Sequence, residues 1–448
     1  MSNIVAYPLS FSLVRNYMVF TFKRYYSEYI VTGRENIPAE GPVIFAPNHI
    51  NALMDALAVH SIAPYKLPVI FLARADIFKN RTAAKYLKFV KIMPAFRMQD
   101  GMENLGKNNK IFEQCVDILN QNKALGIMPE GNQGEQRKLR PLVKGIFRIA
   151  FTAQQKDNLH PNVKIIPVGI DYGDLEKYGK HIIINIGKPI EVSEYMKSYA
   201  ENTVTATNEI RERLRSDLNK LSLDLATKEY YECFETVVEV ANSTYVKKLS
   251  LPDNTISRFI ARQKIAKRLV TLENTGSEKI EKLDFLCKEY SRLSKKLKLR
   301  SRIIEQKPDA VITILLKGLI LLCILPVFIY GLLLNFLPFF IPVFVRKYIM
   351  KTEYEGFFSS LQFGLGIITF PIFYLLQTLL VCYLPGTSWW MTLIFFCTQY
   401  PFGKWAIKWN GTTKKFIAKL KYRKLANNKS NDLLQVLNVR QQIIQLIS

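Results

Sequence analysis

Few side chains in this chain are suited to proton transfer, and His49 is the one whose neighbours suggest a site. The chain has four histidines, and His49 follows a short apolar run, Val43–Ala46, and precedes a helical pattern that contains Asp55. An imidazole at a strand-to-helix turn lies at the edge of a sheet, where clefts form. With few other histidines in the chain, His49 and Asp55 are therefore candidates for a functional pair, in which His49 would be the base of a His-dependent reaction.

The spacing of the two residues sets a condition on this interpretation. On a regular helix, six positions turn through about 600°, and His49 and Asp55 would then face apart. They can meet only if His49 lies outside the helix and the turn folds it back. The alternative is that His49 caps the helix and Asp55 is an ordinary polar residue. Serine-nucleophile signatures, Walker loops, dinucleotide fingerprints and zinc spacings do not occur in a usable context, so we expect no cofactor and no metal.

The elements that must position this pair alternate between short apolar runs and helical patterns. Five runs have the length and composition of buried strands: Val43–Ala46, Pro68–Ala73, Ala124–Met128, Lys164–Ile170 and His181–Ile186. Helical spacing occupies Met102–Gln121 and Leu142–Gln155. Residues 31–200 are therefore predicted to form an α/β domain with a central sheet.

The composition excludes several classes of protein. Of 448 residues, 49% are apolar, which is too many for a chain that is mainly disordered. The six cysteines are scattered without a C-x-x-C pair, which argues against a disulfide scaffold. The 62 Lys and Arg against 37 Asp and Glu give a formal charge of +25, which suits either nucleic acid or an anionic membrane surface.

The position of the apolar residues favours a membrane. Gly318–Val345 contains 28 residues without a charge, and Gly356–Gly403 contains 48. A bilayer span takes about 20 apolar residues, so the first stretch can cross once and the second twice. We expect residues 307–403 to form transmembrane hairpins, with two hairpins preferred because basic clusters flank both stretches. Buried core helices are the alternative, and the lack of a polar face argues against them.

The other segments have their own character. Residues 1–30 predict an amphipathic helix in the membrane interface, with a core-packing helix as the alternative. Residues 201–306 are helical and basic, with 15 basic and 6 acidic residues between Ile256 and Lys307. Residues 404–448 form a basic tail on the cytosolic side. Such basic segments beside a bilayer suit anionic membrane lipid.

Four ordered blocks resemble the glycerophosphate acyltransferase superfamily, which includes glycerol-3-phosphate and lysophosphatidate acyltransferases. Its N-H-x4-D motif is matched by Asn48, His49 and Asp55 with a spacing of x5, which resembles the branch with the fungal glycerol-3-phosphate/dihydroxyacetone-phosphate acyltransferases. The later blocks are similar to Ile92–Arg97, Met128–Gly131 and Ile166–Val168. The third block departs from the family pattern at Asn132 and Gln133, and Arg137 or Arg140 is a candidate for the missing cation.

The resemblance implies a role for each matched residue. His49 would be the general base for an acceptor hydroxyl, and Asp55 would orient it. Arg74 and Arg97 would bind the acceptor phosphate, whereas Glu130 and Gly131 would bind the acceptor's glycerol part. The donor would be an acyl thioester, either acyl-CoA or acyl carrier protein, used as a substrate.

Three functions remain open at this level. The longer spacing favours glycerol 3-phosphate or dihydroxyacetone phosphate as acceptor in phospholipid biosynthesis, and 1-acylglycerol 3-phosphate (lysophosphatidate) is the alternative within the same chemistry. A catalytically idle lipid-binding scaffold is the alternative from another class. Binding of nucleic acid rests on net charge alone, lacks a recognition motif and is not expected. The expected location is the bacterial inner membrane or the endoplasmic reticulum, with the active domain on the cytosolic face.

Overall fold

A computed structural model of the chain describes residues 4–79, 81–95, 105–155, 162–276, 278–306, 308–350 and 355–447. The chain divides into two compact units. The first comprises residues 1–224 together with 352–360, and the second comprises residues 225–351 and 361–448. The short segment 352–360 therefore belongs to the first unit, although more than a hundred residues of the second unit precede it in the sequence.

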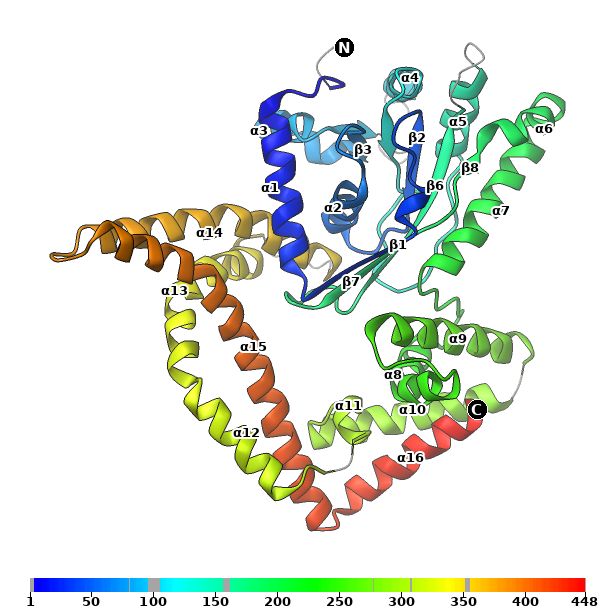
Figure 1. The fold of residues 1–448 in the computed structure, drawn as a ribbon. Helices are drawn as coiled ribbons and strands as arrows, with labels where there is room; N and C mark the ends of the chain where they lie inside the picture. The colour runs from blue at the N-terminus through cyan, green and yellow to red at the C-terminus, as the bar shows by residue number, and fades with distance from the viewer. Residues whose placement is uncertain are drawn as a thin grey trace. The chain divides into compact units, whose positions relative to one another are not determined.

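A mixed sheet forms the centre of the first unit (Figure 1). In order along the sheet its strands are β1 (Glu28–Thr32), β7 (His181–Ile186), β6 (Lys164–Tyr172), β2 (Val43–Pro47), β5 (Ala124–Gly126), β3 (Val69–Arg74) and β4 (Ile92–Ala95), and β8 (Ile190–Glu191) pairs with β6. Neighbouring strands are parallel except where β6 pairs with β7 and β8. The predicted α/β fold with a central sheet is confirmed.

Helices cover both faces of this sheet. They are α1 (Leu9–Tyr25), α2 (Ala52–Ile62), α3 (Arg81–Phe89), α4 (Leu105–Asn120), α5 (Gly145–Gln155), α6 (Met196–Glu201) and α7 (Thr203–Leu221). Figure 1 shows α1 and α2 on one side of the sheet and α5 and α7 on the other. Ile44 and Ala46 of β2 pack with α4, α5 and α7, and because alternate residues of a strand face opposite ways, Phe45 lies on the other face. The first unit extends to Asp224 because α7 packs on this sheet.

The strand directions gather the ends of several strands at one edge. β2, β3, β4 and β5 all run parallel, so their carboxyl ends lie along the same edge of the sheet. His49 follows β2, Arg74 ends β3 and Glu130 follows β5. In sheets of this kind ligands bind outside the carboxyl ends of the strands, so the topology already brings these three positions to one edge.

The N-terminal helix α1 packs one side against the first unit and leaves the other exposed. Its buried side carries Phe11, Arg15 and Phe22, and the Arg15 guanidinium donates to the carbonyl oxygen of Ala63 (2.8 Å) at the end of α2. A cation at the C-terminus of a helix donates to the carbonyl groups that lack partners there and is attracted by the negative end of the helix dipole. Leu9 and Leu13 point outward, 75% and 62% exposed.

All regular secondary structure in the described residues of the second unit is helical. Its helices are α8 (Tyr231–Lys248), α9 (Thr255–Asn274), α10 (Glu278–Leu297), α11 (Ser301–Ile304), α12 (Val311–Cys323), α13 (Leu325–Phe344), most of α14 (Phe358–Cys382), α15 (Trp389–Asn427) and α16 (Asn431–Ile447). The leucines at three- and four-residue intervals in α10, such as Leu283, Leu286 and Leu293, are buried. They face the helices that pack around α10, as an amphipathic pattern requires.

Two helices are long and apolar enough to cross a membrane. One spans Leu325–Met350 (26 residues) and the other Phe358–Cys382 (25 residues). Length and composition alone are also met by core helices of soluble proteins, but such helices are mostly buried. Here only 17% and 6% of the most apolar window of each helix is buried inside the protein. Two large apolar helix surfaces without protein cover are what a lipid environment accommodates.

Candidate active site

His49 and Asp55 meet in a direct hydrogen bond. His49 Nδ1 lies 2.9 Å from Asp55 Oδ2. Helix α2 begins at Ala52, so His49 lies outside it and the turn brings the two side chains together despite their spacing. The Asp55 side chain is completely buried, whereas that of His49 is 17% exposed. Because Nδ1 is engaged with the carboxylate, Nε2 is the ring nitrogen that can take a proton.

The Asp55 carboxylate is held by three further donors. Its Oδ2 atom accepts the backbone N–H groups of Ile50 (2.9 Å) and Asn51 (2.7 Å), and its Oδ1 atom accepts the Tyr172 hydroxyl (2.7 Å). Burial raises the pKa of Tyr172 well above its usual value, and the charge of Asp55 adds to this. The phenol therefore remains protonated and donates. Tyr172 was not among the residues predicted from the sequence, and its signal there is its place at the end of the apolar run 164–172.

Asn48 fixes the point where β2 ends and the turn begins. Its backbone N–H donates to Val168 O (3.2 Å), and its side chain both donates to Ile170 O (3.1 Å) and accepts from Ile170 N (2.7 Å). A side chain thus continues the pairing of β2 with β6 for one more step. This explains why an asparagine precedes His49: its amide has both the donor and the acceptor that a strand neighbour needs.

Glu130 links the His49 turn to Arg140. Its Oε1 atom accepts the backbone N–H of His49 (2.8 Å), and its Oε2 atom accepts both N (3.1 Å) and Nε (3.0 Å) of Arg140. Burial raises the pKa of the Glu130 carboxyl above its usual value, although these hydrogen bonds oppose the rise. Both carboxylate oxygens of Glu130 thus accept hydrogen bonds from within the protein, and the side chain is 1% exposed. In this geometry Glu130 supports the backbone of His49. Its binding of an acceptor hydroxyl stays a prediction.

Gly131 allows the chain to turn directly after Glu130. Its φ of +71° is a conformation that favours glycine, and a Cβ there would lie 3.0 Å from a methyl group of Val143. Its N–H donates to Met128 O (3.1 Å). The amides of Ile50, Asn51 and Gly131 thus all have partners within the protein, so none of these three is a free donor for an oxyanion.

The two predicted phosphate-binding arginines differ in what can be described. Arg74 lies at the carboxyl end of β3, with its side chain 54% exposed and paired with Asp76. Among the described residues, the Arg74 side chain makes no hydrogen bond or ion pair with the turn that contains His49, although both lie at the same edge of the sheet. Arg97 lies outside the described residues. The roles of both in binding phosphate stay predictions.

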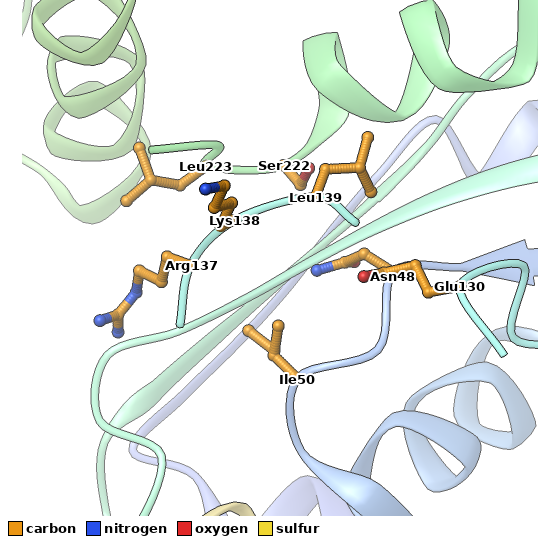
Figure 2. A pocket seen from close by; sticks show the side chains of 8 residues that line it. All are labelled: Asn48, Ile50, Glu130, Arg137, Lys138, Leu139, Ser222 and Leu223. Atoms are coloured by element: carbon orange, nitrogen blue, oxygen red, sulfur yellow. The ribbon is translucent and has the colours of Figure 1, made fainter. Parts of the chain in front are cut away.

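A small polar hollow lies beside the turn. It is lined by Asn48, Ile50, Glu130, Arg137, Lys138, Leu139, Ser222 and Leu223 (Figure 2). The Arg137 side chain points away from Glu130 in this view, and its Nη2 atom donates to Tyr172 O (2.7 Å). Arg140 rather than Arg137 is thus the cation that pairs with the third block. In the part of the chain that the structure describes, no group of three or more His, Cys, Asp or Glu side chains has a metal-binding arrangement.

Comparison with known proteins finds similarity in the region that contains this site. Residues 28–171 match the family model described as Acyltransferase. The chain is 26% identical over 147 residues to glycerol-3-phosphate O-acyltransferase 1 of Saccharomyces cerevisiae, a match that covers 32% of this chain and 19% of the yeast protein. It is 24% identical over 194 residues to 1-acyl-sn-glycerol-3-phosphate acyltransferase of Bacillus subtilis, covering 43% of this chain and 88% of that protein.

A solved structure gives a further match. It is the 1-acyl-sn-glycerophosphate acyltransferase from Thermotoga maritima, with 18% identity, a TM-score of 0.33, and coverage of 46% of this chain and 78% of that one. The sequence matches confirm the resemblance that the four blocks predicted: residues 28–171 match an acyltransferase domain, and the similar proteins are named glycerol-3-phosphate and 1-acyl-sn-glycerol-3-phosphate acyltransferases. The chain matches less than one fifth of the length of the yeast relative.

Proposed function

We propose that this protein is a membrane-bound acyltransferase of phospholipid synthesis that moves a fatty acyl group from an acyl thioester to the hydroxyl of glycerol 3-phosphate or dihydroxyacetone phosphate. The donor is acyl-CoA or acyl carrier protein, bound as a substrate. The yeast relatives support the glycerol 3-phosphate acceptor, because two of them carry that activity in their names.

The His49–Asp55 hydrogen bond is the observation that carries the proposal. His49 Nε2 takes the proton of the acceptor hydroxyl while the hydroxyl oxygen attacks the carbonyl carbon of the thioester. The new C–O bond forms, the C–S bond breaks, and the imidazolium returns the proton to the leaving thiolate. Asp55 holds the ring tautomer and stabilises the imidazolium, as a carboxylate does in other base-assisted acyl transfers. No acyl-enzyme is needed, because the acceptor supplies the nucleophile.

We further propose that the acyl transfer takes place at a membrane surface. The exposed apolar helices Leu325–Met350 and Phe358–Cys382 would cross the bilayer, and the outward side of α1 with Leu9 and Leu13 would lie in its interface. The basic residues of segment 404–448 would then face anionic headgroups on the cytosolic side. A fatty acyl product would leave directly into the bilayer.

The test uses full-length protein in lipid vesicles, with labelled palmitoyl-CoA and palmitoyl acyl carrier protein as donors. Glycerol 3-phosphate, dihydroxyacetone phosphate and lysophosphatidate are offered separately to the wild type, His49→Ala, Asp55→Asn and the exposed-carboxylate control Glu40→Gln. We expect transfer to glycerol 3-phosphate that falls roughly 10²- to 10⁴-fold in the first two variants and is unchanged in the control. Folded wild-type protein that transfers to no acceptor would overturn the proposal.

The second candidate function is acylation of lysophosphatidate to phosphatidate. The relatives from Bacillus subtilis and Borreliella burgdorferi, both named 1-acyl-sn-glycerol-3-phosphate acyltransferase, favour it. The two candidates use the same base and differ only in the acceptor. Transfer to lysophosphatidate in preference to glycerol 3-phosphate would decide for the second.

A further inference from the structure

The helix that follows His49 lacks the usual cap at its own N-terminus. Asn51 is the N-cap residue of α2, yet its side chain makes no capping hydrogen bond. The first N–H groups of a helix have no partner within it, and the N-cap side chain normally accepts from one of them. In α2 that bond is made by another part of the chain: Leu53 N–H donates to Ser360 Oγ at 3.2 Å.

The adjacent serine holds the Asn51 side chain. The Ser359 hydroxyl donates to Asn51 Oδ1 (2.7 Å), while Asn51 Nδ2 donates to Leu175 O (3.3 Å). Asn51, Ser359 and Ser360 are 1%, 2% and 4% exposed. Hydrogen bonds between groups this deeply buried are costly to lose, because water does not replace the missing partner.

Gly356 brings the same segment against the third block. A Cβ at Gly356 would lie 2.6 Å from Gln133 Nε2 and 3.0 Å from Ile50 O, so a larger residue there requires the Gln133 side chain to move and crowds the backbone of Ile50. Gln133 stands at one of the two positions where the third block departs from the family pattern. The N–H of the following residue, Gly134, donates to His49 O (3.0 Å). The segment that contains Gly356 therefore contacts both the turn after His49 and the loop of the third block that bonds to His49 O.

The turn that these contacts surround is strained. Ala52 has a φ of +40°, which an L-residue other than glycine rarely adopts. Such a conformation persists only where surrounding bonds hold it, and strained residues of this kind gather at functional sites. Here the bonds on either side of Ala52 come from Asp55 and from the two serines.

We propose that Ser359 and Ser360 are positioning residues for the His49–Asp55 pair, so that the first turn of the apolar helix α14 completes the catalytic turn. The inference rests on the proposed acyl-transfer function. It means that residues some 300 positions beyond His49 are part of the catalytic unit. A shortened chain ending before residue 355 would lack them even though it contains all four family blocks.

The test measures kcat and both KM values in full-length protein in lipid vesicles. The variants are Ser359→Ala, Ser360→Ala and a matched control, Ser388→Ala, a serine before helix α15 that makes no side-chain cap. We expect each of the first two to lower kcat roughly tenfold with KM changed less than about twofold, and the control to match the wild type. Serine variants that match the control would overturn the proposal.

A coupling measurement separates positioning from a general loss of stability. If Ser359 acts through Asn51, then Ser359→Ala should lower kcat no further in an Asn51→Ala background. Effects that multiply in the double variant would overturn the proposed route. Hydrogen exchange of the peptide 48–56 gives a readout independent of turnover: we expect faster exchange there in both serine variants and unchanged exchange in β6.

The same data distinguish failure of this inference from failure of the proposed function. An inactive wild type would overturn the proposed function and, with it, the catalytic role of the serines. An active wild type whose kcat and exchange are both insensitive to Ser359→Ala and Ser360→Ala would overturn the inference alone.

Discussion

Asp55 Oδ2 accepts hydrogen bonds from the turn that contains His49 and lies 2.9 Å from His49 Nδ1. One oxygen atom therefore fixes both the backbone of the turn and the orientation of the imidazole. The carboxylate is fully buried, so its charge is compensated by these donors rather than by water. A site built in this way is sensitive to any group that supports Asp55.

Tyr172 is the first such group to test. In Tyr172→Phe, Asp55 Oδ1 loses its donor in a buried place, so we expect kcat to fall roughly tenfold and the free energy of unfolding to fall by about 1–3 kcal/mol. The matched control is Tyr26→Phe. Tyr26 is also buried and lies beside Tyr172, but its hydroxyl has no hydrogen-bond partner among the described residues. Equal losses in both variants would show that removal of any hydroxyl here has this effect and would contradict the prediction.

The arginines near the site are predicted to affect different kinetic constants. Arg140→Ala removes the partner of the buried Glu130 carboxylate, which braces the backbone of His49, so we expect a lower kcat. Arg74 is exposed and ends a strand at the same edge, so Arg74→Ala should raise KM for the phosphate-bearing acceptor roughly tenfold or more and leave kcat unchanged. Initial rates at varied acceptor concentration separate the two. A fall in kcat with unchanged KM for Arg74→Ala would contradict its predicted role.

Sequence pattern predicted the strands whose residues are mostly apolar and buried. β2, β3, β6 and β7 lie within a residue or two of their predicted bounds. β1 was not predicted, because the sequence Glu28–Thr32 is half-exposed at the edge of the sheet and lacks an apolar run. β8 has only two residues, which is too short for any periodic signal.

The site was predictable only as far as the residue types of its motifs. That His49 and Asp55 meet depends on where α2 begins and on the left-handed φ of Ala52, and neither follows from a spacing of six. The brace role of Glu130 depends on its burial. The contacts of Ser359 and Ser360 depend on the fold bringing residue 360 to residue 53, and no local pattern records such a contact.

His60 predicts a dependence of stability on pH. Burial, together with the nearby Arg15 guanidinium, lowers the pKa of His60 to about 3. As the pH falls, the His60 imidazole takes up a proton near pH 6.5 in the unfolded chain but not in the folded chain. The free energy of unfolding therefore has its full value above about pH 6.5 and decreases as the pH falls towards 3. The loss is about 1.4 kcal/mol per pH unit within that window. Thermal unfolding at pH 7.5 and 5.0 checks it: the downward shift should be smaller in His60→Leu than in the wild type, and equal shifts would contradict it.

Asn335 predicts how the apolar helices of the second unit hold together. Its Nδ2 atom donates to Gln399 O (3.0 Å) on α15, and its Oδ1 atom accepts the Tyr374 hydroxyl (2.6 Å) on α14, so one amide joins three helices. Where water is absent, a polar group that loses such a hydrogen bond finds few other partners. Interhelical hydrogen bonds of this kind contribute about 0.6–1.7 kcal/mol to stability. Asn335→Leu should therefore lower the temperature at which the protein loses its fold in detergent.

The close approach of the helices at this point supplies a second variant. A Cβ on Gly403 would lie 2.5 Å from the Asn335 side chain, so Gly403→Val should separate α13 from α15 and lower the unfolding temperature further. Thr392→Val is the control, because within the described part of the chain the Thr392 hydroxyl bonds only to Ser388 O, one turn earlier in the same chain segment. Because the control removes a hydroxyl without breaking a bond between helices, it should unfold with the wild type. An Asn335→Leu protein as stable as this control would show that packing alone holds the three helices together.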